Sequence, residues 1–246
     1  MDPADTPTHY PVRRIDYPDC TALERRNTDG TWRVKRIDWP EPLPLVSAIM
    51  SYLGKSHKDY REPDDATPWL RHQMLEPLAV IHRHLEKPCP LGETPVRALL
   101  GGGLHAQAFL TAEDDPEVLK IGVTPLVTRR LDPDMDAPVL SIGSLEGVDP
   151  KGLTVKQRER FDGQIHFYRQ KPAVTDGVTP AHVSQIYNLA LEKGYRPCPT
   201  ELGRTRTDQI GLYDGEPRLL DPECVTIPRP RTPRLPQLSR VFARHR

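Results

Sequence analysis

The amino-acid sequence predicts an α+β protein: an antiparallel sheet with helices, a much reduced helical second lobe, and extended arms at both ends. Apolar runs of strand length alternate with turn signals, and the sharpest signal is Asp214-Gly215, because a type I′ turn needs positive φ at both central positions. Segments with helix-capping signals lie before and among these runs. Proline, at 28 of 246 residues, gathers in the terminal segments and connections, where it favours extended chain.

Shifts in composition divide the chain into five predicted segments. The β-rich part covers residues 95–174, and the reduced second lobe covers residues 175–226 and ends just after the Asp-Gly hairpin. The other three segments are an extended N-terminal arm (1–41), a helical addition (42–94) and a tail rich in proline and arginine (227–246).

Two helices are expected before the β-rich part. Residues 42–56 form an apolar run that we expect to be a short helix ending near Gly54. Thr67 has the features of the N-cap of a second helix, whose apolar face runs to Leu85. Pro77 should kink this helix because proline lacks a backbone donor.

Further elements follow from turn and capping signals. In the N-terminal arm, Asp29-Gly30 is typical of a hairpin turn followed by a strand from Trp32. The later expected elements are a short helix from Thr124 to Leu131, strands over 138–148 and 164–174, and a helix capped by Thr179 and ending before Gly194.

Charge and cysteine usage exclude several classes of protein. The 34 basic residues balance 34 acidic ones, so no global nucleic-acid footprint is indicated. The four cysteines have no paired short spacing, which favours reduced thiols over a zinc site or a disulfide framework. No apolar run approaches the roughly 20 residues that span a bilayer, and no signal-peptide core is present, so a cytoplasmic protein is expected.

The first candidate site lies at the open end of the Asp-Gly hairpin. Gln209 precedes its first apolar run and Asp221 follows its second, so the hairpin should bring an amide and a carboxylate together. Such a pair could hold a metal ion. Asp221 is followed by proline, however, and an aspartate in this position also commonly caps a turn, so both interpretations are open.

The second candidate site lies upstream, where Gly101, Gly102 and Gly103 follow an apolar run and a strand-like segment leads to Lys120. The glycines could let the backbone approach a phosphate, or they could form only a tight turn. Lys120 could contact the phosphate, or it could be a solubilising charge on an edge strand.

The order of these segments resembles the protein kinase-like superfamily over roughly residues 95–222. In that family a glycine-rich loop covers the nucleotide phosphates, a lysine on the third strand pairs with them, and an asparagine and an aspartate hold magnesium. The resemblance therefore implies ATP and Mg²⁺ as ligands, with Gly101, Gly102, Gly103 and Lys120 on the nucleotide and Gln209 and Asp221 on the metal. It also implies a five-stranded small lobe, with residues 171–174 as the connection between lobes.

Several departures from the kinase pattern argue against phosphotransfer. The catalytic aspartate should lie five residues before the metal-binding amide, but that position is Arg204, and the only nearby carboxylates are Glu201 and Asp208. No glutamate follows Lys120 at the place of its usual ion-pair partner, where Asp132, Asp134 and Asp136 occur in a proline-broken run. Only 25 residues follow Asp221, too few for the large lobe that presents peptide substrates.

Two classes of function remain. The first is a pseudokinase-like binding or regulatory module that retains a nucleotide or phosphate ligand. Within this class, an enzyme that transfers phosphate to a small molecule is a remaining hypothesis. The second is an assembly protein of a larger particle formed in the cytoplasm, such as a phage virion, whose proline-rich arms bind protein neighbours. The tail, with six arginines and no acidic residue, could bind an acidic partner or stay solvated. Oligomerisation fits the assembly hypothesis.

Overall fold

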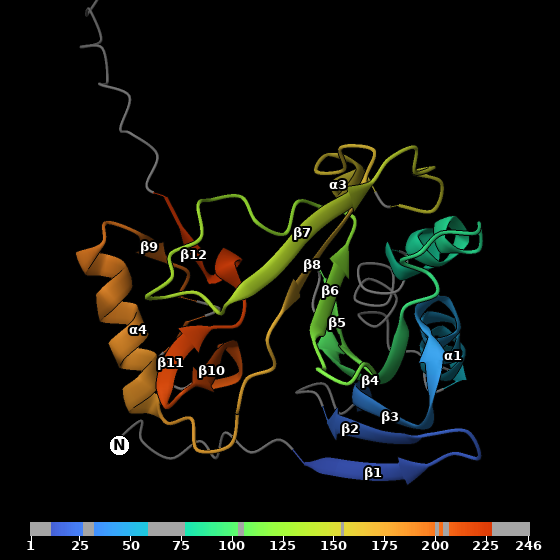
Figure 1. The fold of residues 1–246 in the computed structure, drawn as a ribbon, viewed down its shortest axis with the longest axis horizontal. Coiled ribbons are helices and arrows are strands. Elements are labelled where there is room, and N and C mark those ends of the chain that lie inside the picture. The colour runs from blue at the N-terminus through green and yellow to red at the C-terminus, as the bar shows by residue number, and fades with distance from the viewer. Residues whose placement is uncertain are drawn as a thin grey trace, which may run out of the picture.

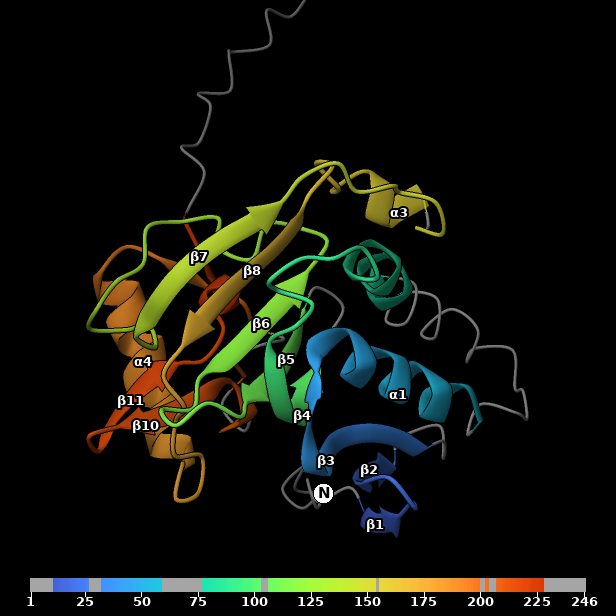
Figure 2. The ribbon, with the colours of Figure 1, turned by 45° about the vertical axis from the view of Figure 1, so that its right-hand side comes forward.

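The computed structural model describes residues 11–26, 32–58, 77–102, 106–153, 155–199, 202–203 and 207–227. Its main feature is one antiparallel sheet of eight strands, which curves through the molecule (Figures 1 and 2). In spatial order the strands are β1 (Val12–Asp16), β2 (Thr21–Arg26), β3 (Trp32–Pro44), β4 (Pro95–Gly102), β5 (Gln107–Thr111), β6 (Val118–Gly122), β8 (Ile165–Gln170) and β7 (Val139–Leu145). The predicted α+β class with an antiparallel sheet is confirmed.

Residues 12–16, 21–26 and 32–44 are part of this sheet, which corrects the expectation of an extended arm over residues 1–41 for the part of it that the structure describes. Strands β1, β2 and β3 pair in succession, and β3 pairs with β4 through Ile37 and Leu99. The pairing of Arg26 with Trp32 agrees with the predicted hairpin, whose turn at Asp29-Gly30 lies outside the described residues. The isolated apolar residues of this segment are explained by pairing, because alternate residues of a strand face the core.

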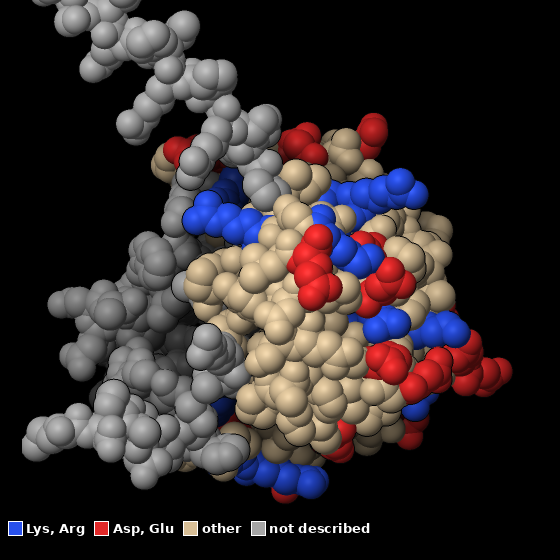
Figure 3. Space-filling view, turned by 90° about the vertical axis from the view of Figure 1, so that its left-hand side faces the viewer, with Lys and Arg blue, Asp and Glu red and all other residues tan. Residues whose placement is uncertain are grey.

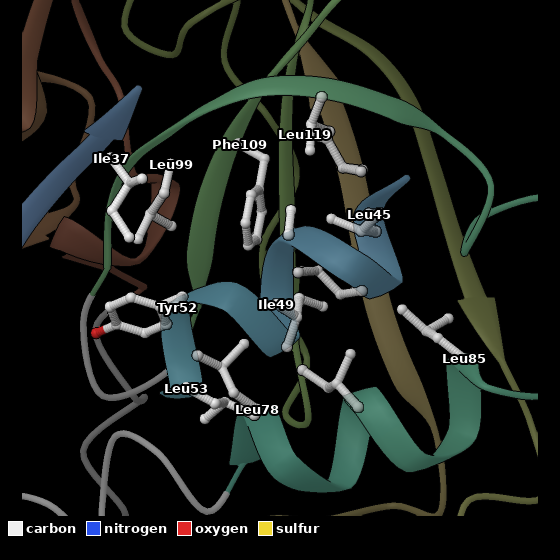
Figure 4. Close-up of a cluster of buried hydrophobic side chains, with 14 of the residues drawn as sticks. Ile37, Leu45, Ile49, Tyr52, Leu53, Leu78, Leu85, Leu99, Phe109 and Leu119 are labelled. Carbon is white, nitrogen blue, oxygen red and sulfur yellow. The ribbon is translucent and has the colours of Figure 1, made fainter. Parts of the chain in front are cut away.

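One face of the sheet is covered by two helices. These are α1 (Leu45–Lys58) and the helical residues 77–85. Figure 4 shows their apolar side chains packed against those of β3, β4, β5 and β6, in a core that includes Ile37, Leu45, Ile49, Leu99 and Phe109. Each of these five side chains is at most 1% exposed. Burial of aliphatic and aromatic side chains of this size is the main source of stability for such a layer.

The helix boundaries differ from those predicted. Helix α1 begins at Leu45 because the preceding residues continue strand β3. It runs through Gly54 to Lys58, and no atom lies near the position that a Gly54 side chain would take. The predicted start of the second helix at Thr67 lies outside the described residues.

The segment after β6 has no helix. Residues 123–137 form bends and turns, which corrects the expected helix from Thr124 to Leu131. Pro125 and Pro133 interrupt the segment, and Arg129 is buried in an ion pair that local helical periodicity does not reveal. Strands β7 and β8 agree with the strands predicted over 138–148 and 164–174. Between them the structure has a short helix, α3 (Val155–Arg158).

The C-terminal part forms a second, smaller core. It contains α4 (Pro180–Glu192), the hairpin β10 (Ile210–Tyr213) with β11 (Glu216–Leu219), the pair β9 (Arg196–Pro197) with β12 (Val225–Thr226), and the 3₁₀ turns η1 (Thr207–Gln209) and η2 (Pro222–Cys224). The predicted cap of α4 is confirmed, since Thr179 is its N-cap and Gly194 follows its end with a φ of 79°.

The outer surface near α4 is poor in charge. Residues 177–191 contain no lysine, arginine, aspartate or glutamate. The face of the molecule on the α4 side accordingly has a broad central area without charged side chains (Figure 3).

Candidate functional site

The Asp-Gly hairpin forms as predicted and brings the two C-terminal candidates together. Asp214 and Gly215 have φ values of 52° and 84°, as a type I′ turn requires. At the open end of the hairpin, the Leu220 amide donates to the Gln209 carbonyl over 2.9 Å. Gln209 and Asp221 are thus held at the same end of the β10–β11 pair.

Both side chains have local partners in the turn η2. Asp221 Oδ1 accepts a hydrogen bond from the Glu223 amide over 3.0 Å and so caps this turn. Gln209 Oε1 lies 3.6 Å from Cys224 Sγ, which donates to it. The capping interpretation of Asp221 is therefore confirmed, and its second carboxylate oxygen makes no hydrogen bond to the described residues.

Lys120 reaches this end of the hairpin from the large sheet. Its Nζ donates to the carbonyl oxygen of Leu220 over 2.5 Å, although the two residues are 100 positions apart in the sequence. Tyr168 lies directly opposite on β8, with its ring centroid 5.4 Å from Lys120 Nζ and its hydroxyl 3.4 Å from the same carbonyl. The predicted convergence of Lys120 on the residues around Asp221 is present.

Burial dominates the electrostatics of this cluster. Removal from solvent lowers the pKa of Lys120, and the nearby Asp221 carboxylate and Cys224 thiol oppose this by favouring the charged amine. Burial also raises the pKa of Tyr168 far above its usual range, and Asp221 adds to the effect. The arrangement is a half-buried amine with one carboxylate in the neighbourhood but not paired with it, which suits an anionic ligand group that replaces the lost hydration.

Gly101 shares a row of the sheet with Lys120. Gly101 pairs with Ala108, and Ala108 pairs with Lys120, so the three residues lie on one face across β4, β5 and β6. Two strand spacings separate Gly101 from Lys120, or about 10 Å. Gly101 has a φ of 150°, which side chains rarely allow, and it lies at a bulge in β4.

The other two glycines are placed differently. A Cβ atom on Gly102 would lie 1.5 Å from Gln107 Oε1, so this glycine makes room for a neighbouring side chain. Gly103 lies outside the described residues, as do Glu201 and Arg204. Asp208 is exposed on η1, and no hydrogen bond or ion pair to Lys120 is found for it.

The acidic residues after β6 are engaged elsewhere. Asp132 and Asp134 form ion pairs with Lys193 at 2.9 and 2.8 Å. Asp136 is buried against Arg129, whose two terminal nitrogens donate to its carboxylate over 2.7 and 2.5 Å. No carboxylate of the described residues lies within 4 Å of Lys120 Nζ.

The residues at hand do not form a metal site by themselves. No group of three or more histidine, cysteine, aspartate or glutamate side chains in the described ranges could hold a metal ion. Asp221 supplies one carboxylate, and Glu223 is bonded to the Thr128 amide and hydroxyl. Mg²⁺ is usually bound by one or two carboxylates together with phosphate oxygens. Asp221 and Gln209 therefore fit magnesium only if the ligand brings its own phosphates.

Sequence reasoning missed three groups of this site. Tyr168 and the Leu220 carbonyl join it through strand register, and Cys224 joins it through the turn η2. Gln170, on the same face of β8 as Tyr168, is 3% exposed, and its Oε1 has no hydrogen-bond partner among the described residues. A buried acceptor without a partner is costly to stability.

Comparison with known proteins adds no assignment. No model of a known protein family matches the chain, and no curated protein matches its sequence. Within the described residues, no helix is long and apolar enough to cross a membrane.

Proposed function

We propose that this protein is a kinase-like module without phosphotransfer activity that binds a nucleotide or another phosphate compound. The observation that carries the proposal is the meeting of Lys120 with the Leu220–Asp221 segment, on the sheet face that also bears Gly101. An amine, a carboxylate and a glycine without a side chain, gathered from three distant segments, are elements that kinase-like proteins use to bind phosphate.

The order of the strands supports the kinase-like part of the proposal. The five strands assigned to a small lobe, β4 to β8, are contiguous in the sheet, and the segment that links them to the C-terminal part follows directly from β8. This segment is bonded to the hairpin, since Val174 and Leu212 exchange two backbone hydrogen bonds and the Tyr213 hydroxyl donates to the Lys171 carbonyl. These bonds would hold the linking segment against the hairpin beside the proposed site.

The lack of phosphotransfer rests on the sequence around Gln209. Arg204 replaces the carboxylate that accepts the proton of the attacking hydroxyl in kinases. The lowered pKa of Lys120 fits a binding role, because a phosphate beside the amine would restore its charge and be held by it.

The test is a thermal-denaturation titration with ATP and Mg²⁺, adenosine, and pyrophosphate. Binding to the folded state stabilises it by RT ln(1 + [L]/Kd), or about 2.7 kcal/mol at 100 times Kd. We expect ATP and pyrophosphate to raise the melting temperature and adenosine to have little effect. The Lys120→Ala variant should lose the response relative to its own ligand-free baseline, and the control Lys151→Ala, at an exposed lysine between β7 and α3, should keep it.

Two results would overturn the proposal. One is a wild-type protein whose melting temperature does not change at millimolar ATP or pyrophosphate. The other is hydrolysis or transfer of the ATP γ-phosphate by the wild type that is lost in Lys120→Ala, which would support the hypothesis of an enzyme.

The alternative function, an assembly protein of a larger particle, keeps support from the tail. Strands β1, β2 and β3 of the segment that was expected to act as an arm are paired within the sheet, so these residues are not available in that form. The tail after Ile227 lies outside the described residues. Size-exclusion chromatography with light scattering separates the two functions, since a binding module needs no high-order complex.

A further inference from the structure

The two edges of the large sheet differ in their chemistry. β1, at one edge, carries Arg13, Arg14 and Asp16, and Arg13 forms an ion pair with Glu24 at 2.6 Å. β7, at the other edge, reads Val-Leu-Ser-Ile-Gly-Ser-Leu and contains neither a charge nor a proline. An edge strand offers unpaired amide and carbonyl groups to a second strand, and charges and prolines are the usual protection. Only one edge of this sheet carries charges, and the other has a single bulge between Val139 and Ser141.

The β7 edge is exposed and apolar. Leu140 and Ile142 are 47% and 60% exposed, and among the described residues β7 pairs with β8 alone. Figures 1 and 2 show β7 along the outer side of the sheet. Ile142 lies opposite Tyr168, so it extends the row that contains Lys120 to the edge of the sheet.

β7 has a regular extended conformation that could pair with a second strand. Its only irregularity falls between Val139 and Ser141, so residues 141–145 pair regularly with β8. The Phe167 ring packs over Gly143, where an added Cβ would come within 2.4 Å of Cζ. A preformed strand loses little conformational entropy when a second strand pairs with it.

We propose that β7 is the interface of a homodimer, in which β7 of a second copy pairs with it antiparallel about a two-fold axis near Ile142. The charge pattern selects this occupant. Two-fold pairing places the uncharged strand against itself, sets Ile142 beside its own copy, and puts Glu146, the first charged residue after the strand, opposite Pro138. No like charges meet, and the result is one continuous sixteen-stranded sheet, from two sheets of eight.

Pairing of β7 with β1 of another copy is less favourable. It would bring Arg14 and Asp16 against apolar side chains and remove their charges from water. It would also form an open chain of molecules, because a contact between unlike surfaces closes only by a suitable rotation.

The experiment is sedimentation velocity of the full chain over a range of concentrations, with two variants that make the same change at opposite edges. Val12 on β1 is 63% exposed and Ile142 on β7 is 60% exposed. We expect wild type and Val12→Lys to be dimers. Ile142→Lys should weaken self-association by at least roughly 100-fold, since two apolar side chains lose their contact and two like charges meet at the axis.

Hydrogen exchange provides a second readout that does not depend on a variant. The backbone amides of residues 141–145 should exchange more slowly in concentrated than in dilute wild-type protein, while those of β1 should not change. A wild type that is monomeric at all concentrations overturns the proposal, and so does a dimer that Ile142→Lys leaves intact. Open chains that Val12→Lys disrupts would assign the contact to β1 instead. Thermal melting of each variant confirms that it is folded.

Discussion

The Lys120 amine donates a hydrogen bond to a backbone carbonyl, whereas the corresponding lysine of a kinase pairs with a carboxylate. The bond to Leu220 satisfies one of its three donors, and the Tyr168 ring covers another side of the amine. A carbonyl has no net charge, so it offsets only part of the cost of removing an ammonium group from water. Burial of the Lys120 ammonium group therefore lowers the stability of the ligand-free protein, and an anionic ligand would reduce this cost.

This cost predicts a specific pH dependence for Lys120→Met. Because the pKa is lower in the folded than in the unfolded state, the folded protein releases its proton first as the pH rises. Wild-type stability should therefore rise relative to Lys120→Met between the lowered pKa and the ordinary value of about 10.4. Urea denaturation at a series of pH values measures the difference. Lys171→Met, at an exposed lysine, should show no such rise, and parallel curves for Lys120→Met and wild type would contradict the burial of the amine.

Asp221 has two predicted roles that its variants can separate. Asp221→Ala loses the hydrogen bond from the Glu223 amide, and loss of such a cap costs about 1 kcal/mol. Asp221→Asn keeps a side-chain acceptor and should be nearly as stable as wild type. If Asp221 also binds Mg²⁺, Asp221→Asn should reduce the part of the ATP-dependent thermal stabilisation that requires Mg²⁺. An unchanged Mg²⁺ response in Asp221→Asn would leave only the capping role.

At this scale the sequence identified the residues that are tied to local patterns. Lys120 lies in the middle of a recognisable strand, and Gln209 and Asp221 flank a recognisable hairpin. Tyr168 was not identified because its position opposite Lys120 depends on strand register, and a shift of one residue would turn it to the other face. Cys224 was missed because a buried thiol has no sequence signature apart from its partners.

At the scale of elements, the link between β8 and the hairpin is a packed contact. Residues 171–174 run beside β10, and a Cβ on Gly211 would lie 2.3 Å from Ala173 Cβ. Ala173 and Leu220 leave no room for a larger residue at this position. The absence of a side chain at Gly211 is what allows the connecting segment and the hairpin to approach so closely.

Two glycine substitutions should therefore change stability in opposite directions. Gly211→Ala should destabilise the protein by about 1–3 kcal/mol through overpacking. Gly54→Ala, in an exposed turn of α1 with open space around it, should stabilise the protein by roughly 0.5–1 kcal/mol, because glycine loses more conformational freedom in a helix. Chemical denaturation measures both values. A neutral Gly211→Ala would show that the segment moves freely from the hairpin.

Arg129 joins its own segment, which follows β6, to two parts of the C-terminal core. Its guanidinium group donates to Asp136 and to the Pro222 carbonyl, and it lies 5.0 Å from the Tyr195 ring centroid. Arg129→Met should cost about 3–5 kcal/mol because it leaves the Asp136 carboxylate buried without a counter-charge. The double variant with Asp136→Asn should recover a large part of that loss. Urea denaturation of the single and double variants checks this, and additive losses would contradict the coupling.

The same ion pair explains why the helix predicted from Thr124 to Leu131 is absent. Local signals favoured a helix, but Arg129 and Asp136 are satisfied by long-range contacts that require an irregular backbone. Where side chains repeat with helical spacing and end in a positive-φ glycine, as in α4, local signals and tertiary packing agree. The prediction held for α4 for that reason.

At the scale of the whole molecule, two cores share one chain. The larger joins the sheet to α1 and the helical residues 77–85, and the smaller joins α4 to the β10–β11 hairpin. Lys120 and residues 171–174 connect them. The sequence indicated this division near residue 175, but it assigned the first three strands to an arm, because pairing with β4 links residues about 60 positions apart.

The place of these strands predicts a large effect for Ile37→Ala. Ile37 is fully buried and pairs with Leu99, so truncation should leave a cavity and cost about 2–5 kcal/mol. Val12→Ala is the matched control, because Val12 is 63% exposed on β1 and its loss should change stability by less than roughly 0.5 kcal/mol. An N-terminal segment lying loosely on the surface would make both changes small. Equal, small shifts in the urea midpoint would therefore contradict the burial of β3 in the core. They would also contradict the position of the charged strand β1 at the edge of the sheet, on which the choice of partner for β7 depends.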